Sequence, residues 1–176
     1  RGQPQATLIK VFDLSEEAEV AKVYAGVKSL WASIHIAGGF AAAKITDIDK
    51  TALMAQIDSN LASCFLCCRT AVKAMVPAGG GRIVNVAARP ALEPRSGAGM
   101  TAYTVAKAGV AALTMALAEE VAKDGVLVNA VAPGLVPTDD SLAPGGTLSK
   151  PSRIARQVSA VPLRRLGTAD DIRAAC

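Results

Sequence analysis

The chain has 176 residues, of which 51% are hydrophobic and 3% aromatic, and it carries a formal net charge of +4. This length supports one domain with a hydrophobic core, residues 1–176, and is too short for two comfortable ones. The basic residues are scattered, and the densest pair is Arg164 and Arg165, whereas proteins that bind nucleic acid more often show a basic stripe or run. The charge therefore predicts no nucleic-acid partner, although it mildly favours an anionic ligand such as a phosphate-bearing cofactor.

Strand-like and helix-like segments alternate along the chain. Ser15 is a good N-cap for the first helix, and two glutamates follow in the first turn, where the helix dipole favours them. The expected elements are a strand at 7–14, a helix at 15–29, a strand at 30–39, a helix at 46–75, a strand at 82–86, a helix at 101–123 and a strand at 126–134. Apolar strands separated by helices are typical of a parallel sheet that is covered on both faces, so we predict an α/β fold.

The carboxyl ends of the expected strands carry residues that suit a ligand site. Residues 37–39, Ala87 with Ala88, and Pro133 with Gly134 each follow a strand. Open parallel sheets bind ligands at this edge. The segment 137–151 is rich in Pro, Gly, Ser, Thr and Asp, and we expect it to be a mobile loop beside the site.

Three cysteines, Cys64, Cys67 and Cys68, lie in the long helix expected at 46–75, and the first and third share a face. A metal site is one interpretation, but there is no second cysteine pair, and His35 is the chain's one histidine. We therefore expect no metal and treat these cysteines as small hydrophobic residues of a packed helix. Free thiols suit a reducing compartment, and we expect neither a signal peptide nor a membrane-spanning run, hence a cytoplasmic protein.

Tyr103 and Lys107 form the clearest chemical pair, because residues four apart on a helix point to one spot. A phenol is a poor acid at neutral pH, with a reference pKa of about 10. A nearby ammonium favours the phenolate, so we expect Lys107 to lower the pKa of Tyr103 toward a range useful for acid–base catalysis. This spacing alone occurs in many unrelated chains, so its context decides the interpretation.

In its context the pair is part of a larger pattern, because the chain resembles the short-chain dehydrogenase/reductase family over nearly its whole length. The matching segments occur in the family's order and close to its spacing. They are Asp13 at a strand end, Ala37 and Gly38 in HIAGG, Asn60 in DSNL, Tyr103 and Lys107 in YTVAK, Asn129, Pro133, Gly134 and Thr138 in VNAVAPG and LVPT, and 162–172. The resemblance implies a Rossmann-like, doubly wound parallel sheet with helices on both faces, in three layers (α/β/α).

The resemblance also implies a function, which is hydride transfer between a nicotinamide cofactor, NAD or NADP, and a small-molecule carbonyl or alcohol. Tyr103 would donate or accept the proton, Lys107 would lower its pKa and hold the ribose, and Asn60 would anchor a water in the proton relay. The cofactor-binding residues that it implies are Asp13, Leu14, Ala37, Gly38, Gly39, Tyr103, Lys107, Pro133, Gly134, Val136 and Thr138.

Simpler structural roles stay open for some of these residues. Asn60 could bond to the backbone at a helix kink, because a buried Asn finds a partner either way. Residues 37–39 could form a tight turn, which would also let a cofactor approach closely. The family packs the helices equivalent to 64–75 and 105–122 across subunits, so we expect a homodimer or homotetramer, although small residues there also fit burial against the sheet.

The sequence departs from the family at its ends and after the 30–39 strand. The glycine-rich phosphate loop is absent, and the matching segments begin near the family's third strand and stop before its last. Because such a sheet would expose central edges, we expect a longer chain of about 250 residues. The determinant of NAD or NADP preference follows the second strand, so this choice stays open. His35 and Ile36 replace the family's Asn pair, and a lone His at a strand end is more often structural.

A chemical departure lies at Ala88, where the family has the Ser that steadies the substrate oxygen. Losing one oxyanion donor can cost about 3–4 kcal/mol of transition-state stabilisation. Ser96 or Thr101 could substitute, although loop hydroxyls are usually turn formers. Arg89 could meet an anionic substrate or phosphate, but it also fits a solvated loop residue. Ala88, Arg89 and Ser96 are therefore the candidate substrate residues.

Three functions are compatible with this pattern. The first is an active reductase without the Ser, as in the dihydropteridine-reductase branch, which keeps the Tyr and Lys and has a Gly-Met like Gly99 and Met100 before the Tyr. Its quinonoid substrate accepts hydride without forming a full alkoxide. The second is a carbonyl or alcohol oxidoreductase with a substitute donor. The third is a cofactor-binding scaffold subunit with little catalysis, which the retained Tyr103, Lys107 and Asn60 disfavour.

Overall fold

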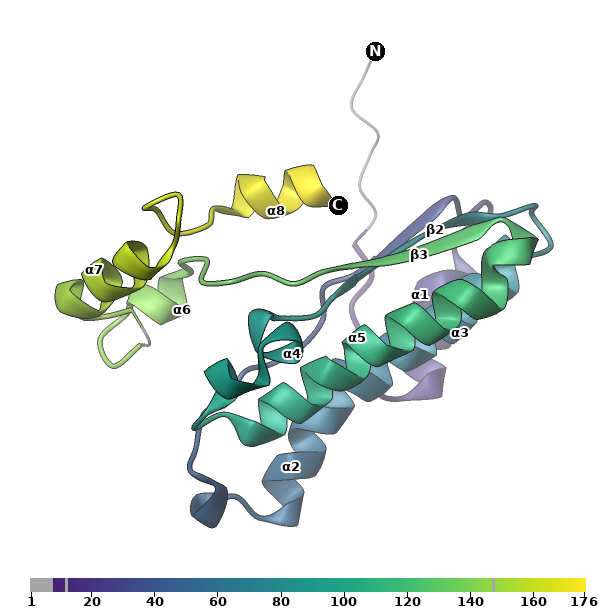
Figure 1. The fold of residues 1–176 in the computed structure, drawn as a ribbon. Helices are drawn as coiled ribbons and strands as arrows, with labels where there is room; N and C mark the ends of the chain where they lie inside the picture. Colours follow the sequence, from purple (N-terminus) through teal and green to yellow (C-terminus); the bar gives the residue numbers. More distant parts are fainter. Residues whose placement is uncertain (1–7, 12, 147) are drawn as a thin grey trace.

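A three-stranded parallel sheet forms the centre of the computed structural model, which describes residues 8–11, 13–146 and 148–176. The strands are β1 (Ala32–His35), β2 (Gly81–Val86) and β3 (Val126–Val131), in the order β1-β2-β3 (Figure 1). The register pairs Ile34 with Val84 and Val84 with Asn129. All three carboxyl ends therefore lie at one edge, as the sequence predicts.

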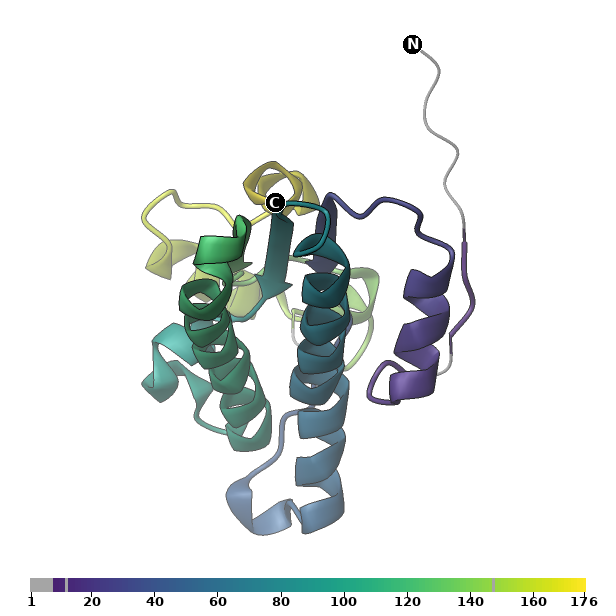
Figure 2. The ribbon, with the colours of Figure 1, turned by 90° about the vertical axis from the view of Figure 1, so that its right-hand side faces the viewer.

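Helices lie on both sides of this sheet. They are α1 (Glu17–Ala25), α2 (Lys50–Ile57), α3 (Ser63–Met75), α4 (Arg89–Leu92), α5 (Thr101–Val121), α6 (Asp139–Leu142), α7 (Pro151–Ala160) and α8 (Ala169–Ala175). Helices α3 and α5 pack on one face with α1 beside α3, and α8 lies on the opposite side (Figures 1 and 2). This arrangement confirms the predicted α/β class.

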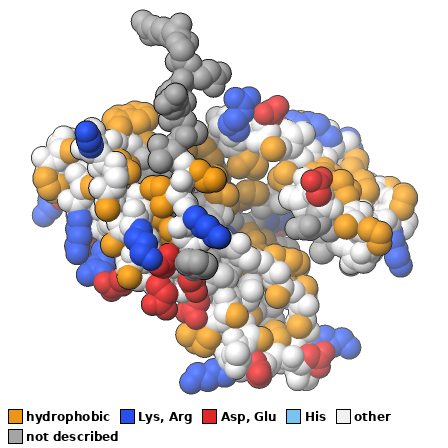
Figure 3. Space-filling model, turned by 180° about the vertical axis from the view of Figure 1, so that it is seen from behind, with side chains coloured by type: hydrophobic (Ala, Val, Ile, Leu, Met, Phe, Trp, Pro, Cys, Tyr) orange, Lys and Arg blue, Asp and Glu red, His pale blue; other side chains and the backbone are white. Residues whose placement is uncertain are grey.

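The hydrophobic core lies between the sheet and helices α3 and α5. Alternate strand residues such as Ile83 and Val126 are buried there against Val110 of α5 and Met75 of α3. Burying each such side chain contributes about 1.5–3 kcal/mol. On the other face Ile34 and Leu127 are each 48% exposed, so the second layer covers the sheet only in part. Hydrophobic side chains are visible in a hollow between the α6–α8 region and the rest of the molecule (Figure 3).

The N-terminal segment differs from expectation. The predicted strand at 7–14 is wrong for residues 8–11, which have no strand structure, while residues 7 and 12 lie outside the described part. A strand needs a neighbour to complete its hydrogen bonds, and within the described residues none pairs with 8–11. Ser15 is not the N-cap either, because its backbone N–H and hydroxyl both donate to Asp13 Oδ1, and α1 begins after Glu16.

The predicted long helix at 46–75 is divided into several turns. A 3-10 turn (Ile45–Asp47) precedes α2, whose N-cap Asp49 accepts a 2.7 Å hydrogen bond from the Ala52 N–H. A π-helical turn (Asp58–Ala62) then joins α2 to α3 and contains the buried Asn60. Single π turns inside helices occur frequently at functional sites, so this turn marks Asn60 for attention.

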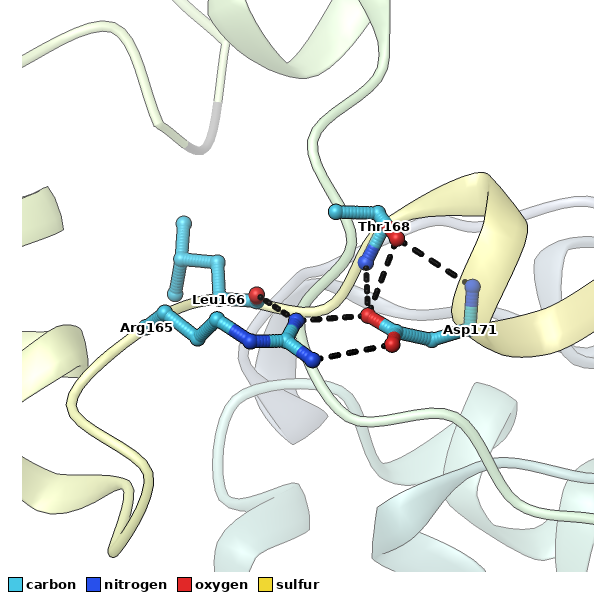
Figure 4. Close-up of polar contacts among 4 residues, drawn as sticks. All are labelled: Arg165, Leu166, Thr168 and Asp171. Atoms are coloured by element: carbon cyan, nitrogen blue, oxygen red, sulfur yellow. Dashed lines mark hydrogen bonds and ion pairs between the residues drawn. The ribbon is translucent and has the colours of Figure 1, made fainter.

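The segment 137–151, where we expected a mobile loop, contains the short helix α6, and α7 begins at its last residue. Its other described residues form neither helix nor strand. Thr138 and Ser141 form a capping box at α6, with hydrogen bonds of 2.8 Å and 3.2 Å. Thr168 and Asp171 form another at α8, and Arg165 donates two hydrogen bonds to the Asp171 carboxylate, of 2.6 Å and 2.9 Å (Figure 4). These partners hold the pKa of Asp171 well below its usual range, with the Arg165 hydrogen bonds the largest cause.

Helix α5 contradicts the expectation that the chain holds no run fit to span a bilayer. The helical segment Thr101–Asp124 has the length and hydropathy of a membrane span. It nevertheless packs against β3, α2 and α4, and buries Ala106 and Val110 in these contacts. By its position α5 is the central helix that covers the sheet.

Candidate functional site

The site lies where the carboxyl ends of the three strands meet the first turns of α5. Beyond the strands, the Ala87 N–H donates to the Val131 carbonyl at 2.9 Å and the Arg89 N–H donates to the Pro133 carbonyl at 3.0 Å. These bonds hold the segments after β2 and β3 side by side. The predicted Ala88 and Pro133 are thus brought to one edge.

Lys107 enters this edge from α5 and is buried. Its Nζ donates a 2.7 Å hydrogen bond to the Val86 carbonyl, at the last residue of β2. Burial lowers the pKa of Lys107, because the charged ammonium loses water there. The strand end thereby fixes the position of the ammonium.

Tyr103 lies one helical turn before Lys107 and is half-buried. Its ring packs edge-on against Phe40, with ring centroids 5.0 Å apart and an interplanar angle of 82°. Burial raises the pKa of Tyr103, so the expected lowering by Lys107 is wrong for this arrangement. The cause of this rise is the loss of water around the phenol, while the Lys107 Nζ lies 6.0 Å from the Tyr103 ring centroid and donates its hydrogen bond to Val86.

Asn60 completes the group from the π-helical turn, and it is only 1% exposed. Its Nδ2 donates to the carbonyls of Gly39 at 3.0 Å and Gln56 at 3.1 Å, so the structural role of bonding to backbone does hold. Its Oδ1 is buried and has no partner among the described residues. An unpaired buried acceptor costs about 1–3 kcal/mol, which favours a donor bound at this atom.

Gly38 is the point at which these groups come closest. A Cβ at Gly38 would lie 2.6 Å from Asn60 Oδ1 and 3.5 Å from Lys107 Nζ. Only a residue without a side chain leaves room beside both atoms. The turn after β1 therefore passes close to both an unpaired acceptor and an ammonium.

The hydroxyls of the segment after β2 are either bonded locally or exposed. Ala88 is buried and precedes α4 as its N-cap residue. The Arg89 guanidinium is held by Glu93, with Nε and Nη2 each 2.8 Å from Oε2. Ser96 donates to the Glu93 carbonyl at 2.8 Å, and Thr101 is exposed at the start of α5. Both Arg89 and Ser96 thus have local partners.

The remaining predicted cofactor residues fall into two groups. Leu14 and Ala37 line one cavity of about 280 Å³ beside β1, and Asp13 nearby in sequence is exposed. The backbone and hydroxyl of Ser15 hydrogen-bond to Asp13 and lower the pKa of its carboxyl. In the second group, Gly134 is exposed after β3, Val136 packs near Gly167, and the Thr138 hydroxyl caps α6.

Two contributors to the site carry no signal that the sequence interpretation used. Phe40 supports the Tyr103 ring, and the Val86 carbonyl anchors Lys107. Phe40 follows Gly38 and Gly39 directly, so an aromatic residue after the paired glycines is the signal that could have identified it. A backbone carbonyl leaves no mark in a sequence.

Comparison with known proteins places this geometry in a family. A family model described as enoyl-(acyl carrier protein) reductase matches residues 2–176. An acetoacetyl-CoA reductase from Cupriavidus necator is 38% identical over 133 residues, which cover 76% of this chain and 50% of that protein. A short-chain type dehydrogenase/reductase from Picea abies is 31% identical over 168 residues, covering 91% of this chain and 59% of that protein. The chain thus spans about half the length of the curated relatives that it matches.

A solved structure gives the same result for the fold. A candidate NAD(P)-dependent gluconate 5-dehydrogenase from Beutenbergia cavernae, with NADP bound at low occupancy, matches with a TM-score of 0.83 and 30% identity. The match covers 92% of this chain and 64% of the other. The sheet, the helix that carries Tyr103 and Lys107, and these relatives together show that the chain belongs to the short-chain dehydrogenase/reductase family.

Proposed function

We propose that the protein is an NAD(P)-dependent oxidoreductase in which Tyr103 exchanges a proton with the oxygen of a carbonyl, alcohol or quinonoid substrate. The observation that carries this proposal is the meeting of Lys107 Nζ and the unpaired Asn60 Oδ1 beside Gly38, one helical turn from Tyr103. A purely structural edge would have no need for a buried ammonium beside an unsatisfied acceptor.

The residues at this edge fit a nicotinamide cofactor. The exposed backbone at 37–39 and at Gly134 allows close approach, and the Lys107 ammonium suits ribose hydroxyls. The bound nicotinamide would supply or accept the hydride. The likeness to a structure with bound NADP supports a cofactor of this class, and NAD and NADP are both retained as candidates.

Each catalytic side chain has a defined task in this proposal. The Tyr103 hydroxyl donates or accepts the proton. The contact between the Tyr103 ring and Phe40 holds the ring beside the carboxyl ends of the strands. The Val86 carbonyl holds the Lys107 ammonium in place. A bound ligand that brings the Tyr103 phenol nearer to this ammonium would favour the phenolate. Asn60 Oδ1 accepts a hydrogen bond from a water in the proton relay.

The substrate class follows from Ala88. A ketone develops negative charge on its oxygen, and one missing donor costs about 3–4 kcal/mol at that atom. Since Arg89 and Ser96 are bonded to Glu93, neither replaces the missing hydroxyl in this arrangement. A quinonoid or otherwise delocalised acceptor, which spreads this charge, is therefore the favoured substrate, with simple ketones and alcohols as slower ones.

The same observation supports a second candidate function, a cofactor-binding scaffold with weak or no catalysis. The side chains of Ala87 and Ala88 have no hydrogen-bond donor for a substrate oxygen. The edge could therefore keep cofactor binding while catalysing little or no hydride transfer. The two candidates are separated by following the absorbance of NADH and NADPH with quinonoid, ketone and alcohol substrates. Tight cofactor binding without turnover on any of them would establish the scaffold.

The role of Tyr103 has its own test. Because a positioned general acid contributes about 100- to 10,000-fold, Tyr103→Phe is expected to lower kcat by that factor. Cofactor affinity, measured by fluorescence quenching, should change little, which separates loss of proton transfer from loss of binding. Turnover unaffected by Tyr103→Phe would remove Tyr103 from the mechanism.

We also propose a cytoplasmic homodimer or homotetramer that associates through α3 and α5. Phe65 on α3 and Met115 on α5 are 50% and 70% exposed, which is unusual for large apolar side chains on central helices. Phe65→Glu is expected to shift the protein toward monomer in light scattering, whereas Leu142→Glu on the distant α6 should leave the assembly unchanged. Monomeric wild-type protein at all concentrations would refute this assembly.

A further inference from the structure

A second cluster of reactive side chains lies between β1, β2 and α3. One ring nitrogen of His35, Cys64 Sγ and Cys68 Sγ all lie within 4.8 Å of one another. His35 ends β1, and the two cysteines share the face of α3 that is turned to the sheet. Helix α3 alone offers two ligands, which is too few to predict a metal site from the sequence. The sheet adds His35 to these two cysteines.

The distances suit a tetrahedral metal. Cys68 Sγ is 3.5 Å from His35 Nδ1. Zinc with bonds of about 2.3 Å to sulfur and 2.0–2.1 Å to nitrogen places these two atoms about 3.5 Å apart at the tetrahedral angle. Cys68 and His35 would therefore need little movement to receive the ion, and Cys64 Sγ lies within 4.8 Å of both ligand atoms.

We propose that His35 Nδ1, Cys64 Sγ and Cys68 Sγ bind a soft metal ion with tetrahedral coordination, and that Zn²⁺ is the preferred ion. Two thiolates and one imidazole select zinc over hard ions such as magnesium or calcium. The three residues are 9%, 5% and 1% exposed, in the order His35, Cys64 and Cys68, so most of the site would be shielded from solvent.

Asn85 provides a fourth donor from β2. Its Oδ1 is 2.8 Å from His35 Nδ1, and it accepts a 3.4 Å hydrogen bond from the Cys68 thiol. A bound metal ion would replace the protons in these hydrogen bonds, because its ligands are thiolates and an unprotonated ring nitrogen. The Asn85 Nδ2 donates to Thr114 Oγ1 at 2.9 Å, which fixes the orientation of the amide and leaves Oδ1 directed at the cluster. Two sulfurs, one ring nitrogen and one amide oxygen thus converge here, and the amide oxygen would take the position that a fourth Cys or His holds in most structural zinc sites.

The surroundings of His35 also suit metal binding. Metal-bound His residues usually donate their second ring N–H to an oxygen, which fixes the tautomer. His35 Nε2 lies 2.9 Å from Ser33 Oγ and 3.2 Å from Tyr24 OH. With Nδ1 on the metal, Nε2–H would donate to one of these hydroxyls. The cavity beside β1, lined by Tyr24, Ser33, His35 and Cys64, gives the ion a path of entry.

The test is metal binding by the reduced, metal-free protein, with Zn²⁺ and Co²⁺ as the probes. We expect one Zn²⁺ per chain and a Co²⁺ complex with thiolate charge-transfer absorption and the intense visible bands of a tetrahedral site. Cys64→Ser and Cys68→Ser should each weaken Zn²⁺ binding at least about tenfold. Cys67→Ser is the matched control, because Cys67 lies on the same helix, is also buried, and its sulfur is not in the triad.

Three outcomes would overturn the site: no stoichiometric Zn²⁺ bound by the wild-type protein, a Co²⁺ complex without thiolate absorption, or equal losses in Cys67→Ser and Cys68→Ser. The wild-type Co²⁺ spectrum decides the matter even if a variant fails to fold. A rise in Tm with Zn²⁺ is expected for the wild type, because a ligand that binds only the folded state stabilises it. None of these measurements requires turnover, so they are independent of the proposed oxidoreductase activity.

Discussion

Gly38→Ala is the substitution that most directly tests the geometry around Asn60 and Lys107. The new methyl would lie 2.6 Å from Asn60 Oδ1, about 1 Å inside an ordinary contact, and 3.5 Å from Lys107 Nζ. Asn60 cannot move away freely, because its Nδ2 is bonded to the carbonyls of Gly39 and Gln56. The strain therefore falls on the π-helical turn or on the segment after β1.

Overpacking of this kind typically costs about 1–3 kcal/mol. For a chain of this size, each kcal/mol lowers Tm by about 2–4 °C, so we expect a fall of about 2–12 °C in a thermal melt. Gly39→Ala is the matched control, because its methyl would be 3.6 Å from Ser59 Oγ, an ordinary contact. We expect Gly38→Ala to weaken cofactor binding as well, since the methyl fills the space beside Lys107.

Equal Tm values for Gly38→Ala and Gly39→Ala would refute the close approach of Gly38 to Asn60. A lower Tm with unchanged cofactor affinity would support the close contact between Gly38 and Asn60. It would also show that the cofactor does not bind beside Gly38. Gly26→Ala, at the end of α1, has nothing within 4 Å of its new methyl and serves as the reference for activity.

Three other changes test single residues. Ala88→Ser should raise turnover of ketones by about 100- to 1,000-fold if a missing oxyanion donor limits them, and an unchanged rate would show that the hydroxyl is not needed. Lys107→Met should weaken cofactor binding, whereas Lys123→Met, in the exposed 3-10 turn that follows α5, should not. Burial lowers the pKa of Lys107, so between the lowered pKa and 10.5 the unfolded chain binds more protons than the folded one. The free energy of unfolding in urea should therefore rise with pH across this range in the wild type. Lys107→Met should lack this rise. The folded structure lowers the pKa of Asp171, so the stabilisation from its cap on α8 is fully present above pH 3.8 and is lost as pH falls through the lowered pKa. Amide hydrogen exchange in α8 should therefore speed up at low pH in the wild type but not in Asp171→Asn. Asp170→Asn is the control and should behave like the wild type.

The fold followed from the sequence where local pattern and final structure agree. The runs that became β2 and β3 are mostly apolar and rich in Val and Ile, and each begins at or directly after a glycine, so the local pattern was enough to predict both strands. The run at 7–14 has the same local pattern, but residues 8–11 form no strand. A strand is stabilised by its neighbour, and no property of the run itself reveals whether that neighbour is present.

The candidate site shows the same division between local and distant information. Tyr103 and Lys107 are four residues apart, so helix geometry alone predicts that they share a face. The state of their protons was not predictable, because it depends on the Val86 carbonyl, which holds Lys107, and on the burial of the phenol. A spacing motif identifies which groups are present, whereas the packed structure decides their pKa values.

His35 and the cysteines extend this reasoning to groups that lie far apart in the chain. Cys64 and Cys68 share a helical face in any helix, but His35 joins them only because β1 lies beneath α3, and Asn85 joins only because β2 pairs in register with His35. Counting ligands along one helix therefore underestimates the cluster by half. A parallel sheet aligns the ends of its strands, so residues at equal depth on neighbouring strands converge on whatever helix covers them. His35 and Asn85 occupy paired positions of this kind, and the metal site is a consequence of that register.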